Sequence, residues 1–124
     1  MPPDPRDKAH LWDILDAART AVEFVGSLRF EEFLKDRKTR WAIERSLEIV
    51  GEASRRVSPE TRDQYPEIPW KSIIGLRNVL AHEYGEVLYD NIWGVCINRL
   101  PILIHQLEAM GADNLPKEDE PLKE

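Results

Sequence analysis

Apolar residues recur at three- and four-residue steps through most of this 124-residue chain. This spacing places them on one face of an α-helix, whereas a half-buried strand would alternate at every second residue. No segment shows the alternation of a strand. The pattern predicts helices or helical turns at about 4–26, 30–34, 36–57, 58–60, 69–85 and 87–110. We therefore expect an all-α fold, an up-and-down helical bundle of about four to five helices.

Residues that typically cap helices mark three of these starts. Asp4 and Ser58 are each followed by proline, and Asp36 precedes the longest apolar pattern. Their side-chain oxygens can accept hydrogen bonds from free N–H groups of the first turn, and proline fits the first helical position. Gly26 is a plausible end for the first helix.

Three further features predict how the helices pack. The helix at 36–57 carries apolar residues on two faces, as a helix does in the middle of a bundle or at a dimer interface. Gly75 lies inside the helix at 69–85, at a cost of about 1 kcal/mol against alanine, which close contact with another helix could offset. Pro101 should kink the last helix, because proline lacks a backbone donor and crowds the preceding turn.

The length predicts one domain that buries about two-thirds of its unfolded surface. We assign residues 1–110 to a helical domain and the acidic, proline-bearing residues 111–124 to a disordered tail. Cys96 is the lone cysteine, so no internal disulfide can form and a reducing compartment fits. The N-terminus lacks the apolar region of a signal peptide, and no apolar run is long enough to span a bilayer. We expect a cytoplasmic protein without a membrane partner.

The net charge of −6 argues against a protein that holds nucleic acid by bulk positive charge. The charge is unevenly distributed, however. Residues 111–124 contain five acidic and two basic residues, which accounts for half of the negative excess. Residues 35–62 contain eight basic and five acidic residues, a local surplus of three positive charges. A localised basic cleft on an acidic protein is therefore compatible with the sequence.

The segment Arg-Asn-Val-Leu-Ala-His-Glu-Tyr, at residues 77–84, places reactive polar groups at the end of an apolar helical pattern. Arg77 can direct two donors at one phosphate, and His82 can take or give a proton near neutral pH. Asn78 and His82 are four residues apart, so they share a helix face and the amide could orient the imidazole. Arg77 and His82 lie roughly 140° apart around a helix. Spacing alone thus leaves a simpler reading open, in which Arg77 pairs with a buried acid and His82 binds carbonyls at the helix end.

The segment resembles the R-x-x-x-x-H-x-Y motif of HEPN-domain ribonucleases, and in particular that of the HepT-like toxins. The resemblance includes further segments in the same order and covers about 90 of the 124 residues. These segments are ARTAVEFVG, FEEFLKD, AIERSLEIVGEA and YPEIPWKSIIGL, around residues 19–25, 30–36, 42–53 and 65–76. The chain departs from the commoner family pattern after Tyr84, because no large apolar residue follows directly.

The resemblance implies an endoribonuclease toxin that cleaves RNA without a metal or another cofactor. His82 would accept the proton of a ribose 2′-hydroxyl, Arg77 would stabilise the charge that builds on phosphorus, and Asn78 would orient these groups. RNA supplies its own nucleophile. The family forms a two-fold homodimer that brings two motif copies into one cleft, so a homodimer is implied here too. The substrate would be RNA, with transfer RNA as one candidate.

In HepT-like proteins the partner is a minimal nucleotidyltransferase, the antitoxin of a type VII (HEPN/MNT) toxin–antitoxin pair. This antitoxin attaches adenylyl groups to a tyrosine that corresponds to Tyr84. Attached phosphates would occupy the anion site and block RNA, so the modification would act as an off-switch. Tyr89 is a second candidate acceptor. In the simpler reading, Tyr84 is a half-buried residue with its hydroxyl at the surface.

Arg40 and Glu44 are further candidates for contact with RNA. The simpler reading places both on a solvated face of the helix at 36–57, among charged residues at four-residue spacing. No Cys-x-x-Cys or His-x-x-x-His spacing indicates a zinc site. Two alternatives to an enzyme remain: a non-catalytic helical module that binds a nucleotide or a nucleotidyltransferase partner, and a purely structural dimerisation bundle.

Overall fold

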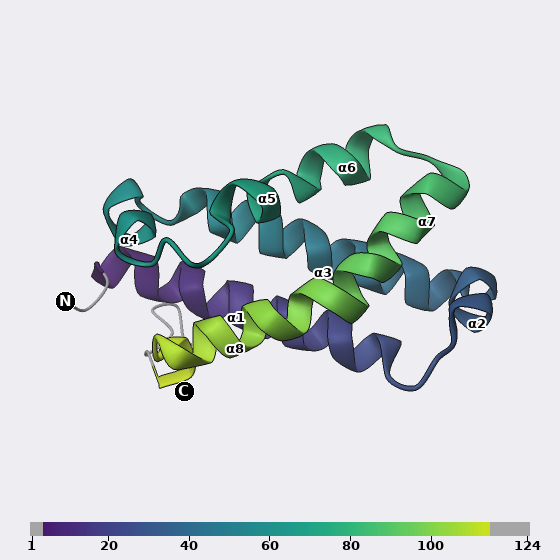
Figure 1. Cartoon of the computed structure of the whole chain (residues 1–124), viewed down its shortest axis with the longest axis horizontal. Helices are drawn as coiled ribbons and strands as arrows, with labels where there is room; N and C mark the ends of the chain where they lie inside the picture. The colour runs from purple at the N-terminus through teal and green to yellow at the C-terminus, as the bar shows by residue number, and fades with distance from the viewer. Residues whose placement is uncertain (1–3, 115–124) are drawn as a thin grey trace, which may run out of the picture.

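A computed structural model of the chain describes residues 4–114, and within this range it contains helices and no strand. Helices α1, α3, the α5–α6 pair and the α7–α8 segment run in alternating directions (Figure 1). The prediction of an all-α fold is confirmed. The α-helices are α1 (Pro5–Val25), α2 (Phe30–Lys35), α3 (Arg37–Arg56), α4 (Pro59–Gln64), α5 (Trp70–Ile74), α6 (Leu76–His82), α7 (Gly85–Gly94) and α8 (Leu100–Ala109). Two shorter turns are the π-helical η1 (Val95–Arg99) and the 3-10 turn η2 (Ala112–Asn114).

The three predicted N-caps are confirmed. The side chains of Asp4, Asp36 and Ser58 each accept a hydrogen bond from a backbone N–H two or three residues later, at 2.7, 3.0 and 3.3 Å. These bonds satisfy donors that a helix start leaves free. Gly26, with a positive φ of 51°, follows the last residue of α1, as predicted. The helix boundaries are thus set largely by local side-chain chemistry.

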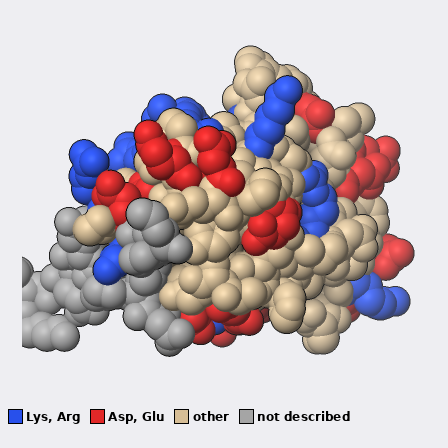
Figure 2. All heavy atoms as spheres, turned by 60° about the vertical axis from the view of Figure 1, so that its left-hand side comes forward, with Lys and Arg blue, Asp and Glu red and all other residues tan. Residues whose placement is uncertain are grey.

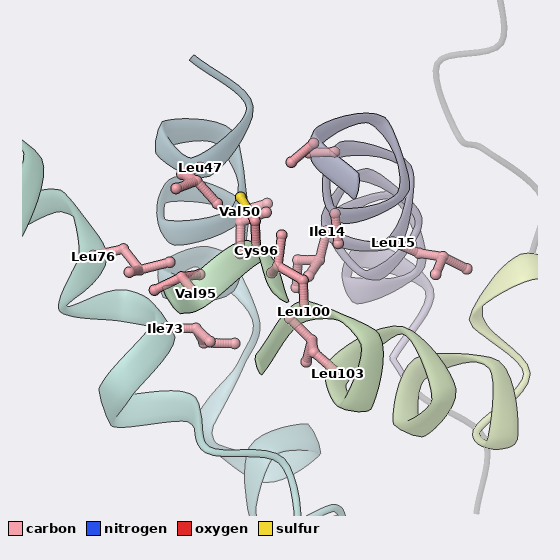
Figure 3. Packing of buried hydrophobic residues seen from close by; sticks show 14 of the residues in the cluster. Ile14, Leu15, Leu47, Val50, Ile73, Leu76, Val95, Cys96, Leu100 and Leu103 are labelled. Atoms are coloured by element: carbon pink, nitrogen blue, oxygen red, sulfur yellow. The ribbon is translucent and has the colours of Figure 1, made fainter. Parts of the chain in front are cut away.

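The core lies between α1, α3 and the α7–α8 segment, with α5 and α6 packed on α3. Figure 3 shows Leu47 and Val50 of α3 facing Cys96 and Leu100. Leu76 and Ile73 close the core from the side of α5 and α6 (Figure 3). Both faces of α3 therefore carry packing, as its two apolar stripes predicted.

A buried carboxylate joins the start of α1 to the start of α4. Asp7 is 3% exposed. It accepts hydrogen bonds from the Ser58 hydroxyl at 2.6 Å, the Ser58 N–H at 3.0 Å and the Thr61 hydroxyl at 2.6 Å. A buried charge is tolerated where such bonds replace water. This contact fixes the segment that leads into α5 and α6.

The predicted single helix at 69–85 is wrong, because the structure divides it into α5 and α6 at Gly75. Gly75 ends one helix and precedes the other, and its Cβ would meet only carbonyl oxygens of its own helix, at 3.3 and 3.4 Å. The expected close approach to another helix occurs instead at Gly51 of α3. Gly85 does not end the motif helix but begins α7, with a positive φ of 60°.

The last long helix is interrupted before Pro101 by a π-helical turn. The turn η1 directly precedes the proline-bearing start of α8, and the Leu100 N–H bonds the Val95 carbonyl five residues back. A wider turn makes room for a ring that crowds the carbonyl four residues earlier.

The packed domain extends beyond the boundary that we placed at residue 110. Ala112 is fully buried, and Asp113 lies 3.5 Å from the guanidinium of Arg19. Assignment of 111–113 to a disordered tail is therefore wrong, because this stretch packs against α1 and α8. The rest of the expected tail, 115–124, lies outside the described residues. Within the described range no helix combines the length and apolarity needed to cross a membrane.

Candidate active site

An open groove of about 830 Å³ runs between α3 and the α5–α6 pair. It contains two of the three predicted catalytic residues, Arg77 and Asn78, together with Glu44. His82 does not line it, although Leu80 and Ala81, just before it, do. The remaining lining residues are Trp41, Arg45, Glu48, Ile74 and Gly75.

Gly51 of α3 leaves room for the Arg77 segment to lie close to α3. A Cβ on Gly51 would lie 3.1 Å from Cγ of Arg77 and 3.2 Å from the carbonyl oxygen of Ile73. Both distances are tighter than ordinary van der Waals contact, so the missing side chain at Gly51 lets α5 and α6 lie this close to α3 without a shift. The close approach sets where the arginine enters the groove.

An ion pair holds the far end of the same side chain. Arg77 Nη1 lies 3.1 Å from Glu52 Oε1. The other carboxylate oxygen of Glu52 binds Arg55 at 2.8 Å and Arg56 at 3.0 Å. Hydrogen bonds from Arg55 and Arg56, with the nearby positive charges, lower the pKa of Glu52. This acid is not buried, and the Arg77 side chain remains 51% exposed, so the simpler reading of a buried ion pair does not describe Arg77.

The other polar residues of the motif are exposed to solvent. His82 is the last residue of α6 and is exposed, and Asn78, one turn earlier, is also exposed. Tyr84 is 79% exposed in the link to α7, so the half-buried reading of this tyrosine is wrong. Glu83 accepts a hydrogen bond from Asn91 of α7. Among residues 4–114 no hydrogen bond or ion pair joins His82 to Arg77 or Asn78.

Glu44 and Arg40 have different surroundings. Glu44 is half-buried in the groove, and burial raises the pKa of its carboxyl, with Glu48 adding to the rise and Arg40 opposing it. Arg40 is turned toward the protein, where it donates to the Leu34 carbonyl and lies 4.8 Å from the ring centroid of Tyr89. These contacts tie α3 to α2 and α7. We therefore keep Glu44 as a candidate for RNA contact and give Arg40 no place in the site.

The groove is close to electrically neutral. Arg45 and Arg77 line it against Glu44 and Glu48, and Arg45 pairs with Glu48 at 3.0 Å. On the face shown in Figure 2, basic and acidic side chains are interspersed and neither sign covers a broad area. The local surplus of positive charge in residues 35–62 therefore does not make the groove lining basic.

The other reactive groups of the described range give no alternative centre. Cys96 is 2% exposed, and burial raises its pKa to about 12, so the thiol is a poor nucleophile at neutral pH. In the part of the chain that the structure describes, no three His, Cys, Asp or Glu side chains gather as metal ligands would.

Three important residues were not singled out from the sequence. Gly51 and Glu52 position Arg77, and Trp41 forms part of the groove wall. A glycine inside a helix was the available signal for Gly51. Glu52 gave no such signal, because charged residues at helical spacing are common on solvated faces.

Comparison with known proteins identifies the family of this chain. The family model described as Ribonuclease HepT-like matches residues 14–110. A candidate RNase of Methanocaldococcus jannaschii is 39% identical over 91% of this chain and 93% of its own length. A candidate RNase of Caldanaerobacter subterraneus subsp. tengcongensis is 38% identical over 83% of this chain and 92% of its length. No solved structure gives a significant match.

These matches place this helical-bundle protein in the ribonuclease class. The probable ribonuclease HepT of Thermococcus cleftensis is 36% identical over 83% of this chain and 94% of its own length. The chain belongs to the HepT-like ribonuclease family.

Proposed function

We propose that this protein is a metal-independent endoribonuclease toxin of a type VII (HEPN/MNT) toxin–antitoxin system. The observation that carries the proposal is the position of Arg77. Its stem is packed on Gly51, its guanidinium is held by Glu52, and it lines a groove together with Asn78. A fixed cation beside an open groove is what cleavage of a phosphodiester requires, because negative charge builds on phosphorus in the transition state.

The chemistry needs one base and one cation at the scissile phosphate. A histidine removes the proton of the 2′-hydroxyl, the 2′-oxygen attacks phosphorus, and the bond to the 5′-oxygen breaks. Arg77 stabilises the charge on the phosphoryl oxygens, and Asn78 orients the groups around it. The leaving 5′-oxygen takes up a proton from a second histidine or from water. The products are a 2′,3′-cyclic phosphate and a 5′-hydroxyl.

A homodimer would complete this site. One chain presents Arg77 to the groove, whereas His82 lies outside the groove lining. A two-fold interface repeats each contact, so it could place His82 of a second copy opposite Arg77 of the first. We therefore propose that the active site is shared between two copies.

Expression in a bacterial host tests the proposal. The wild-type chain should slow growth and fragment cellular RNA, whereas Arg77→Ala and His82→Ala should do neither. His105→Ala, which changes an exposed histidine of α8, serves as the control and should be as toxic as the wild type. Equal growth and intact RNA in all cases, with partner binding retained, would favour the non-catalytic module instead.

We also propose that a cognate nucleotidyltransferase neutralises the toxin by transferring AMP from ATP to the Tyr84 hydroxyl, with release of pyrophosphate. The exposure of Tyr84, 79%, and its place two residues after His82 support this. Co-expression should add about 329 Da per AMP to the wild type and to Tyr89→Phe, and nothing to Tyr84→Phe, which should stay toxic. Modification of Tyr84→Phe to the same extent would contradict the assignment.

A further inference from the structure

Trp41 is a large aromatic residue that the mechanism above does not use. It lies near the start of α3, is 57% exposed, and forms part of the wall of the groove that contains Arg77 and Asn78. Single exposed apolar residues are common on proteins. The position of this ring in the same groove as the proposed phosphate-binding arginine makes it a candidate for substrate contact.

A neighbouring arginine covers the Trp41 ring. The guanidinium carbon of Arg37 lies 4.4 Å from the ring centroid, an arrangement that a cation–π interaction favours. Arg37 is one turn before Trp41 and does not line the groove, whereas Trp41 does. One face of the indole is thus supported by the arginine, and the ring still contributes to the groove wall.

The position of Trp41 along α3 suits a strand that continues from Arg77. Gly51, which contacts Arg77, lies ten residues beyond Trp41, about 15 Å along the helix axis at 1.5 Å per residue. Since α3 and α6 run in opposite directions (Figure 1), Trp41 lies toward the His82 end of α6. A strand held by its phosphate at Arg77 could therefore place a base at Trp41 within a few nucleotides.

The charge of the groove indicates which force would hold that strand. With Arg45 and Arg77 opposed by Glu44 and Glu48, neutralisation of many phosphates cannot supply the affinity. Stacking of a base on an aromatic ring requires no net charge and tolerates any base. It does require that the base be unpaired and free of its neighbours.

We propose that Trp41, supported by Arg37, is the stacking platform for an unpaired nucleobase of the RNA whose phosphate binds at Arg77. This inference rests on the proposed ribonuclease function and specifies its substrate class. The substrate is single-stranded RNA or an exposed loop, and duplex RNA is excluded.

Binding to a fluorescent single-stranded RNA oligonucleotide tests the proposal, measured by fluorescence anisotropy with the full chain carrying His82→Ala to prevent cleavage. Adding Trp41→Ala should weaken binding roughly 5- to 150-fold, and Trp41→Phe should recover most of the affinity. Phe24→Ala, which removes an exposed aromatic residue of α1 outside the groove lining, is the matched control and should bind like the parent. Thermal unfolding of each variant checks that it is folded.

Two further ligands sharpen the result. The same sequence in a duplex, and an abasic oligonucleotide with the same phosphates, should bind weakly and with no dependence on Trp41. Equal affinity of the parent and Trp41→Ala for the single strand would overturn the proposal. A changed sedimentation coefficient in Trp41→Ala with unchanged RNA affinity would also overturn it, because the ring would then be covered by another protein chain.

Cleavage assays separate this inference from the function on which it rests. In the cleaving wild-type background, Trp41→Ala should raise KM for single-stranded RNA and leave kcat nearly unchanged. If the wild type cleaves and Trp41→Ala has the same KM, the stacking site is overturned and the ribonuclease function is retained. Tight, Trp41-dependent binding by a wild-type chain that never cleaves would overturn the ribonuclease function and retain the stacking site.

Discussion

The two ends of helix α6 differ in how firmly the structure holds them. At its start, Arg77 is packed against Gly51 and paired with Glu52 of α3. At its end, His82 is exposed, and beyond it Tyr84 has most of its surface in solvent. In the proposed mechanism, α3 therefore supports the residue that would bind phosphate, whereas the residue that would move protons has no such support.

This difference explains how one motif could serve both catalysis and control. A preorganised cation contributes most to a transition state when it needs no rearrangement. An exposed histidine and tyrosine, by contrast, are accessible to a second copy of the chain and to a modifying enzyme.

The largest effect is expected for Arg77 itself. Arg77→Ala should lower the rate of RNA cleavage by about 10²- to 10³-fold, as loss of one transition-state donor does. Arg77→Lys should recover little, because lysine cannot present the forked pair of donors. The measurement is cleavage of a labelled RNA by purified protein. Arg56→Ala removes another arginine bound to Glu52 and should stay within about twofold of the wild type; an equal loss there would contradict the special role of Arg77.

The contact at Gly51 should be the next most sensitive. In Gly51→Ala the new methyl group meets the Ile73 carbonyl and the Arg77 stem. Overpacking costs about 1–3 kcal/mol and the helix propensity of alanine returns up to about 1 kcal/mol. We expect a net loss of up to about 2 kcal/mol in the free energy of unfolding, measured in urea, and roughly tenfold slower cleavage.

Gly94 provides the matched control for Gly51. It is also helical, but apart from its chain neighbours and the adjacent backbone of its own helix, no atom lies within 4 Å of where its Cβ would be. Gly94→Ala should raise the free energy of unfolding by up to about 1 kcal/mol and leave cleavage unchanged. If both variants gain stability and cleave normally, the close approach at Gly51 does not position the site.

A smaller effect is expected for Glu52→Gln. Exposed ion pairs contribute little to stability, so the free energy of unfolding should change little, but cleavage should fall about three- to tenfold as Arg77 loses its anchor. Because its pKa is lowered in the folded state, the stabilisation by Glu52 is present above the ordinary pKa of 4.5 and is lost as the pH falls through the lowered value. The stability difference between wild type and variant should thus disappear in acid. Glu48→Gln, which frees Arg45 instead, should not slow cleavage; a similar loss would point to a general effect of charge.

The smallest effect is expected for Glu44→Gln. Burial raises the pKa of Glu44, so between the ordinary value of 4.5 and the raised value the folded state binds the proton more readily than the unfolded state. The contribution of this group to stability therefore falls as the pH rises. The variant should be slightly more stable than the wild type at neutral pH and equally stable below about pH 4, measured by urea unfolding. A variant that is less stable than the wild type at neutral pH would contradict this prediction.

Much of the fold could be predicted from the sequence because its determinants are local. Asp4, Asp36 and Ser58 act on the first turn that follows them, and the apolar spacing reports which faces are buried. The π-helical turn was not predicted: Pro101 indicated a kink in the last helix, because proline removes a donor without specifying how the helix adjusts. The buried Ala112 was missed because the charged composition around it resembles a tail.

The sequence indicated the residues of the candidate site but not the residues that position them. Gly51 and Arg77 are far apart in sequence, and nothing local indicates that α3 and α6 meet there. For the same reason, the close contact between helices was predicted at Gly75, whereas it occurs at Gly51. Arg40 looked like a solvated residue, and only the position of α7 places the ring of Tyr89 beside it.

The most direct test of the account is cleavage of single-stranded RNA in excess chelator by four samples: wild type, Arg77→Ala, His82→Ala, and the two variants mixed at equal concentration. We predict that the wild type cleaves, that each variant alone is nearly inactive, and that the mixture regains part of the activity. Recovery is expected because a mixed dimer pairs one intact arginine with one intact histidine. Unimpaired cleavage by either single variant, or a mixture that stays inactive although dimers exchange, would contradict a site shared between two copies.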